Sequence, residues 1–256
     1  MKISVVQPDI IWEEKSENLR KLDLLIAALY GKTDLVVLPE LFSTGFSMNP
    51  GRLSELPGSE TFRWMESTAG RGNFGLCGSY MVNDNNLFRN RFVFVSQDGR
   101  SWHYDKRHLF SMADENRAFS PGEERLIFSF GGTRITLFIC YDLRFPVWSR
   151  NRNDYDLAIY SANWPAGRRE GWNTLLKARA IENQCYVAGS NRIGTDGNGV
   201  SYCGDSMIVD PYGKVMAGTN LIEEGSITCE ISMTELSDFR KKFPVLEDAD
   251  EFSIKI

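Results

Sequence analysis

The sequence predicts an α/β fold in which two mixed sheets face each other and helices lie outside them. Segments with strand and helix character alternate along the chain, and several antiparallel hairpins are inserted between them. Many strand segments are apolar throughout, which is typical of sheets that are covered on both faces. No break in composition marks a domain boundary.

The first third of the chain is predicted to alternate strands with helices. Residues 16–30 repeat leucine and isoleucine at the spacing of one helix face, and Gly31 follows as a stop signal. Ser59 can cap the next helix. The predicted elements are strands over 3–6, 34–40 and 74–82 and helices over 16–30 and 60–70.

Three hairpins are predicted where two strand-like segments flank a pair of turn residues. The turns are Asp98-Gly99, Gly131-Gly132 and Pro211-Tyr212. The paired segments are 91–97 with 100–106, 125–130 with 133–140, and 205–210 with 213–218. The remaining predictions are helices over 146–153, 171–184 and 234–242 and strands over 155–163, 186–194 and 226–233.

Composition excludes several classes of function. The net charge is −5 and no stripe of Lys and Arg occurs, so binding to nucleic acid or to an anionic membrane is not expected. No apolar run approaches the roughly 18 residues of a membrane span, and no signal peptide is recognisable. Five cysteines without paired spacing indicate free thiols in a reducing cytoplasm. With no CxxC pair and two histidines, a metal site is not expected.

Three chemically capable side chains stand at the ends of apolar strands. Glu40 ends DLVVLPE, Lys106 ends RSWHYDK and Cys140 ends RITLFIC. Taken singly, each has an ordinary alternative, namely a helix cap, a solvated amine and a packed thiol. Strand ends in a layered sheet lie along one edge, so the three can form one site. A thiolate nucleophile, a proton-shuttling carboxylate and a fixed ammonium together suit attack on a carbonyl carbon bound to nitrogen.

The segments DLVVLPE, YDKRHLF and LFICYDLRFP, in this order, resemble the three signatures of the nitrilase or carbon-nitrogen hydrolase superfamily. The resemblance extends from the strand ISVVQ to the strand SITCEIS. It implies a carbon-nitrogen hydrolase domain over residues 1–256, built as a single four-layer α-β-β-α sandwich. It also implies a homodimer and a reaction that needs neither a metal nor an organic cofactor.

The resemblance assigns roles residue by residue. Cys140 matches the nucleophile, Glu40 the general base and Lys106 the lysine that stabilises the oxyanion. Glu115 matches a second glutamate of the family, and the backbone N–H of Tyr141 the other oxyanion donor. Three acidic neighbours remain alternatives for that second glutamate: Asp114, Glu123 and Glu124.

The segment CYDLRFP, together with LFSTGFSM, KRHLFSMADE and SANWP, is similar to the bacterial omega-amidase branch. This similarity implies hydrolysis of the terminal amide of 2-oxoglutaramate or 2-oxosuccinamate through a cysteine thioester. An N-carbamoyl amino-acid hydrolase or an aliphatic amide hydrolase is the alternative within the superfamily. A non-catalytic relative that binds a ligand or a partner protein is the alternative outside it.

A substrate of this kind carries a carboxylate, which needs hydrogen-bond donors. Arg144 is one candidate, although it can instead pair with Asp142 and brace the turn. Asn163 ends a strand and is a candidate polar contact, whereas Arg168 and Arg169 are interpreted as surface charge. Five side chains are candidate pocket walls, with ordinary core packing as the alternative: Phe42, Phe46, Phe110, Met112 and Trp164.

Overall fold

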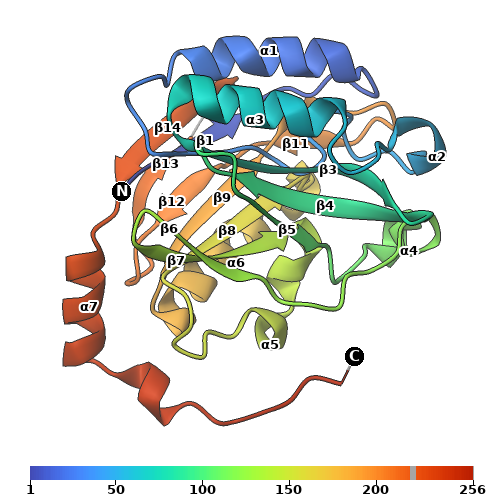
Figure 1. Cartoon of the computed structure of the whole chain (residues 1–256). Coiled ribbons are helices and arrows are strands. Elements are labelled where there is room, and N and C mark those ends of the chain that lie inside the picture. The colour runs from blue at the N-terminus through green and yellow to red at the C-terminus, as the bar shows by residue number, and fades with distance from the viewer. Residues whose placement is uncertain (220–222, 256) are drawn as a thin grey trace.

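The computed structural model describes residues 1–219 and 223–255, and it has two six-stranded sheets packed face to face. Helices α1 (Lys15–Ala27) and α3 (Glu60–Gly72) cover the outer face of the first sheet. Helices α5 (Pro146–Ser149) and α6 (Arg169–Asn183) lie on the opposite side of the molecule, over the second sheet (Figure 1). The predicted α/β class with two facing mixed sheets is therefore confirmed.

The first sheet has the strand order β14-β1-β2-β3-β4-β5. Its strands β1, β2 and β3 are parallel, and the remaining pairs are antiparallel. The bounds are β1 Lys2–Gln7, β2 Leu35–Val37, β3 Gly75–Asp84, β4 Leu87–Val95, β5 Ser101–Asp105 and β14 Gly225–Glu230.

The second sheet repeats this arrangement in the order β13-β12-β9-β8-β7-β6. Its strands β7, β8 and β9 are parallel, with antiparallel strands on either side. The bounds are β6 Ile127–Phe130, β7 Thr133–Ile139, β8 Leu157–Ala162, β9 Tyr186–Asn191, β12 Met207–Val209 and β13 Val215–Gly218. A separate two-stranded ribbon is formed by β10 (Ile193–Thr195) and β11 (Ser201–Cys203).

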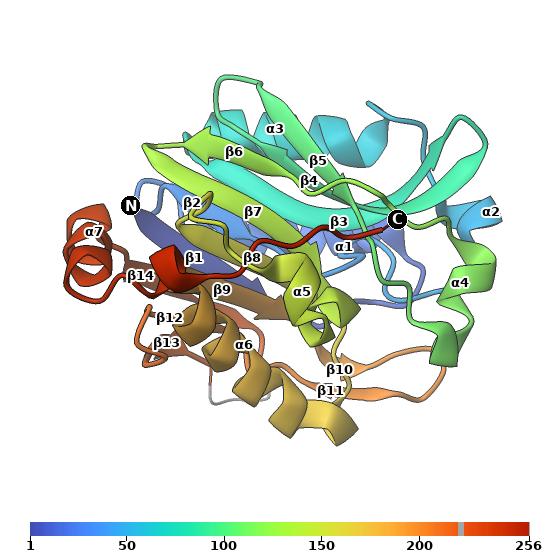
Figure 2. The same ribbon diagram turned by 90° about the horizontal axis from the view of Figure 1, so that it is seen from below.

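The remaining helices are short. They are α2 (Pro50–Leu53), α4 (Glu115–Ala118), α7 (Met233–Lys242) and the 3₁₀ turns η1 (Ser111–Ala113), η2 (Cys140–Arg144), η3 (Ala166–Arg168) and η4 (Val245–Asp248). Among them, α7 and η4 follow the last strand. After α7 the chain runs along the α5 side of the molecule (Figure 2), where the Arg152 guanidinium donates to the Phe252 carbonyl at 3.1 Å. No helix among the described residues is long and apolar enough to cross a membrane.

Several predicted bounds differ from the structure: the strand predicted over 34–40 is β2, which ends at Val37, and the helix predicted over 16–30 is α1, which ends at Ala27. In two further elements, side chains take over backbone hydrogen bonds. The helix predicted over 146–153 ends at Ser149, since the amide of Asn151 binds the carbonyls of Tyr155 and Asn183 at 3.0 and 2.8 Å. The strand predicted over 186–194 is divided into β9 and β10. At the break, the backbone N–H of Arg192 donates to the side chain of Asn191 instead of to a neighbouring strand.

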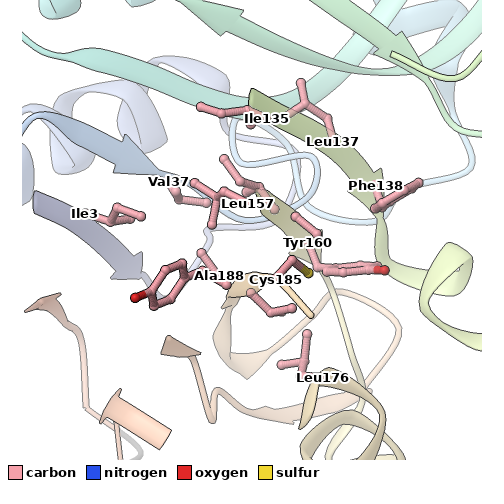
Figure 3. Close-up of a cluster of buried hydrophobic side chains, with 14 of the residues drawn as sticks. Ile3, Val37, Ile135, Leu137, Phe138, Leu157, Tyr160, Leu176, Cys185 and Ala188 are labelled. Carbon is pink, nitrogen blue, oxygen red and sulfur yellow. The ribbon is translucent and has the colours of Figure 1, made fainter. Parts of the chain in front are cut away.

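Alternate residues of the apolar strands face two different layers. On β2, Val37 lies in the core between the sheets, whereas Val36 lies in the cluster beneath α1 and α3. Figure 3 shows Val37 with Leu157 of the second sheet, and Leu176 on the α6 side. Because both faces of these strands are buried, each reads as a continuous apolar run. The strands form a rigid support for the residues that follow them.

Candidate active site

A cavity of about 400 Å³ opens where these strands end. Cys140 directly follows β7, Asn163 directly follows β8, and Lys106 directly follows β5. All three line the cavity, although they come from different sheets. The described lining residues are Phe46, Met48, Lys106, Phe110, Met112, Ala113, Asp114, Cys140, Tyr141, Arg144, Asn163, Trp164, Pro165, Arg168, Asp196, Asn198, Val200 and Tyr202.

Cys140 is half-buried and occupies the sharp turn between β7 and η2. Its φ of 43° lies in the left-handed region, which a non-glycine residue adopts only when the surrounding structure holds it there. Its Sγ lies 3.8 Å from the carbonyl oxygen of Asn163. The turn therefore presents the thiol to the cavity instead of packing it inside the second sheet.

Lys106 joins two buried glutamates. Its Nζ lies 2.7 Å from Oε1 of Glu40 and 2.9 Å from Oε2 of Glu115. All three side chains are inaccessible to solvent. Glu115 is thus the acidic residue that meets Lys106, whereas Asp114 lies on the cavity wall and Glu123 and Glu124 line a different hollow.

Further donors hold the two carboxylates in place. The side-chain amide of Asn90 donates to Oε1 of Glu40 at 2.8 Å and to Oε1 of Glu115 at 3.1 Å. The backbone N–H of Asn163 donates to Oε2 of Glu40 at 2.8 Å, and that of Phe110 to Oε2 of Glu115 at 2.6 Å. Sequence reasoning missed Asn90, which stands between Arg89 and Arg91 on β4 and carries no signal that separates it from an exposed polar residue.

Burial and charge act in opposite directions on these groups. Burial would lower the pKa of Lys106, but the charges of Glu115 and Glu40 outweigh it and raise that pKa above its usual value. Burial raises the pKa of Glu115, and Lys106 partly opposes this rise. Burial and the charge of Glu40 raise the pKa of the Cys140 thiol, which Lys106 again partly opposes. The Cys140 thiol, with its pKa raised, thus lies beside the carboxylate of Glu40 and the ammonium of Lys106.

Asp142 organises the turn behind the thiol. Its carboxylate accepts hydrogen bonds from the Tyr104 hydroxyl at 2.8 Å and from the backbone N–H groups of His108 and Ile139, each at 3.0 Å. The next residue along from the thiol, Tyr141, lies in the first turn of η2, where backbone N–H groups have no partner within the helix. The Tyr141 residue also lines the cavity next to Cys140.

Arg144 does not brace this turn. Its guanidinium lies over the Trp164 ring, 4.9 Å from the ring centroid, and lines the cavity. The alternative in which Arg144 pairs with Asp142 is therefore wrong, because His108 and two other donors already surround that carboxylate.

The predicted pocket walls are only partly present. Six candidates line the cavity, namely Phe46, Phe110, Met112, Arg144, Asn163 and Trp164. The expectation for Phe42 is wrong: its side chain is fully buried beneath α3 and packs against Trp64 and Tyr80. The chain reverses after Glu40, with Leu41 at a φ of 45°, so that Phe42 turns back into the apolar layer.

Two parts of the wall were not anticipated. One is the tip of the β10–β11 ribbon, where the side chain of Asp196 accepts the backbone N–H groups of Asn198 and Val200. Arg168, interpreted as surface charge, is solvent-exposed but also lines the cavity. Polar turn residues carry no sequence signal that distinguishes a cavity rim from an open surface.

The family model described as Carbon-nitrogen hydrolase matches residues 2–241. The chain belongs to the carbon-nitrogen hydrolase family. Family membership confirms the resemblance found in the three strand-end segments, and it accounts for two layered sheets that converge on one cavity. The chemical roles of Cys140, Glu40, Lys106, Glu115 and Tyr141 remain predictions.

Three known proteins are similar to this chain over nearly its full length. Omega-amidase YafV of Escherichia coli (strain K12) is 45% identical over 254 residues, which cover 99% of this chain and 98% of that protein. The 2-oxoglutaramate amidase of Bacillus subtilis (strain 168) is 36% identical over 251 residues, 96% of either chain. XC1258 of Xanthomonas campestris, described as a CN-hydrolase superfamily protein with an arsenic adduct in the active site, superposes with a TM-score of 0.97 at 38% identity, covering 100% of this chain and 99% of that one.

Proposed function

We propose that this protein is an omega-amidase-like hydrolase that cleaves the terminal amide of small 2-oxo acid amides, releasing ammonia and the dicarboxylate. The observation that carries the proposal is the buried cluster of Glu40, Lys106 and Glu115 beside Cys140, at a cavity that also exposes a guanidinium. The identity to an omega-amidase and to a 2-oxoglutaramate amidase supports this substrate class. 2-Oxoglutaramate and 2-oxosuccinamate are the proposed substrates.

In the first half-reaction, the Cys140 sulfur attacks the amide carbon while Glu40 takes the thiol proton. Lys106 Nζ and the Tyr141 N–H stabilise the negative charge that develops on the carbonyl oxygen. The carbon–nitrogen bond then breaks, and the nitrogen leaves as ammonia with the proton that Glu40 held. The product is a thioester between the acyl group and Cys140.

In the second half-reaction, Glu40 deprotonates a water molecule, which attacks the thioester carbon. The carbon–sulfur bond breaks, and the thiolate recovers the proton from Glu40. Glu115 keeps Lys106 in place throughout, because both of its oxygens contact Nζ, at 3.0 and 2.9 Å. No metal or organic cofactor enters this scheme, since the chain's own side chains supply the nucleophile, the base and the oxyanion donors.

The substrate's far end needs a different set of groups. Arg144 is the proposed partner of its carboxylate, because a planar guanidinium can bind both oxygens at once. Phe46, Phe110, Met112 and Trp164 are the proposed apolar walls along the substrate chain, and Asn163 is a further polar contact. Met112 lies at the rim, with 76% of its surface exposed.

The test is ammonia release from four- to six-carbon amides with and without a 2-oxo group. We expect the highest kcat/KM for 2-oxoglutaramate or 2-oxosuccinamate, and a transient acyl adduct on Cys140 detectable by mass spectrometry of quenched protein. Preference for an N-carbamoyl amino acid or an uncharged aliphatic amide would replace the proposal with that activity. Binding of these amides without turnover or adduct would indicate a non-catalytic relative.

We further propose that residues 1–256 form one domain that acts as a cytoplasmic homodimer. All five cysteines are free, as suits a reducing compartment. Val147 on α5 and Ile181 on α6 expose 57% and 54% of their surfaces, and a second copy packed over these two helices can cover them. Light scattering after size exclusion tests the dimer, and Val147→Glu with Ile181→Glu is expected to yield monomers.

A further inference from the structure

Three neighbouring arginines face different partners near the start of α6. Arg169 forms a bidentate pair with Asp205, at 2.5 and 2.8 Å. Arg144 and Arg168 instead lie over the rings of Trp164 and Phe110, at 4.9 and 5.3 Å from the ring centroids. Within residues 1–219 and 223–255, no carboxylate lies within ion-pair distance of either guanidinium. Both of these charged groups line the cavity with unused donors.

The other cation of the cavity cannot serve the far end of a substrate. Lys106 is engaged by two buried carboxylates. Arg144 and Arg168 are thus the charged donors left for recognition among the described lining residues. Aromatic faces hold both guanidinium planes, which reduces the side-chain freedom that binding must remove. Trp164 links the two, because its ring supports Arg144 while its indole N–H donates to the Arg168 carbonyl at 2.8 Å.

A 2-oxo acid presents more acceptors than one guanidinium satisfies. Its carboxylate takes two parallel N–H donors from one arginine, and the adjacent ketone oxygen requires another donor if it is to leave water without penalty. We propose that Arg168 is a specificity-determining residue that binds the 2-oxo end of the substrate together with Arg144. This inference rests on the proposed function and assigns the preference for a 2-oxo acid to a named side chain.

The proposal is tested by comparing three amides of equal chain length: 2-oxoglutaramate, glutaric acid monoamide and pentanamide. For Arg168→Gln, we expect kcat/KM for 2-oxoglutaramate to fall about 10- to 100-fold, mainly through KM, because a hydrogen bond to a charged donor is lost. The fall is expected to be smaller for glutaric acid monoamide and less than about twofold for pentanamide. Arg168→Lys should recover part of the loss, since it keeps the charge without the planar fork.

Arg117→Gln is the matched control. It also removes a positive charge near the rim, but Arg117 is exposed and contacts Asp114 instead of lining the cavity. All three rates should stay within about twofold of the native protein. Because Arg168 is exposed, the thermal midpoint of Arg168→Gln should also match the native value.

An equal fall on all three amides, or an unchanged preference for the 2-oxo compound, would overturn the role of Arg168. A native protein that hydrolyses pentanamide but not 2-oxoglutaramate would instead overturn the proposed function, and this inference with it. A binding measurement separates the two cases when turnover is absent. Calorimetric titration of Cys140→Ala with 2-oxoglutarate should show binding about tenfold or more weaker once R168Q is added, and equal affinities would refute the inference.

Discussion

The charged groups on the floor of the cavity and those on its rim differ in burial and in their partners. On the floor, Glu40, Lys106 and Glu115 are fully buried and contact one another at 2.7–3.0 Å. On the rim, Arg144 and Arg168 are exposed, and their guanidinium groups rest on aromatic rings instead of on carboxylates. The floor satisfies its charges internally, whereas the rim leaves its charges available to a ligand.

This difference separates fixed chemistry from recognition. Buried hydrogen-bonded charges hold one geometry, as an oxyanion site requires, but they cannot exchange partners with each substrate. Exposed guanidinium groups keep N–H donors that a carboxylate can bind in place of water. Substitutions on the floor should therefore change the rate of the chemical steps and stability together, while substitutions on the rim should change substrate choice alone.

The largest effect is expected from Cys140→Ala. Turnover should fall by about 10⁴-fold or more, because the remaining groups supply no nucleophile. The protein should stay folded, since the thiol is half-buried and its bond to the Asn163 carbonyl is long, at 3.8 Å. Ammonia release measures the turnover, and thermal unfolding measures the stability. The control is Cys229→Ala, at a half-buried thiol on β14, which should keep native turnover. Native turnover by Cys140→Ala would exclude this thiol as the nucleophile.

Lys106→Ala should damage rate and stability together. It leaves Glu40 and Glu115 buried without their cation, so the free energy of unfolding should fall by about 3–5 kcal/mol. Any folded fraction should lose about 10²- to 10³-fold in kcat with the oxyanion donor. Denaturant titration and kcat measure these effects, with the exposed Lys177→Ala as control. A Lys106→Ala protein with native stability and reduced kcat would show that the ion pairs of Lys106 with Glu40 and Glu115 contribute little to stability.

A smaller effect is expected from Asn90→Ala. This change removes the amide that donates to both glutamates, while the two carboxylates and Lys106 remain. We expect kcat to fall about tenfold or more and KM to change little, because a hydrogen bond to a charged group is typically worth about 1.5–3 kcal/mol. Steady-state kinetics with 2-oxoglutaramate measure this. A change confined to KM would place Asn90 with the rim instead of the floor.

The smallest effect is a pH dependence of stability. Folding raises the pKa of the Cys140 thiol, so its contribution is fully present below the unfolded thiol's pKa of about 8.5. That contribution is lost as pH rises toward the higher folded pKa, at no more than about 1.4 kcal/mol per pH unit. Unfolding free energies of the native protein should therefore decline more steeply above pH 8.5 than those of Cys140→Ala. Parallel curves would contradict the burial of this thiol.

Most of the floor could be predicted from sequence because its residues follow rigid strands. Glu40 and Lys106 of the floor, and Cys140 beside it, each end a strand-like segment of the sequence. Lys106 and Cys140 directly follow a strand of the structure, and Glu40 lies three residues beyond β2. Glu115 required the family resemblance, since Asp114, Glu123 and Glu124 are chemically equivalent in sequence. Asn90 could not be identified, because its role depends on which carboxylates face β4 from other elements.

The sequence by itself determined the two-sheet α/β class and singled out the Cys140 thiol, the Glu40 acid and the Lys106 amine as candidates, because hydrophobic periodicity and strand ends are local properties of a chain. The sequence also proposed Arg144 for the rim, but only the tertiary structure decided the other parts of the cavity wall. It turned Phe42 into the core, brought the β10–β11 tip to the cavity and set Arg168 on Phe110 beside a paired Arg169. These outcomes depend on which distant segment packs against each turn. Arg168 and Arg169 are chemically identical in sequence, and they differ only because one contacts Phe110 and the other Asp205.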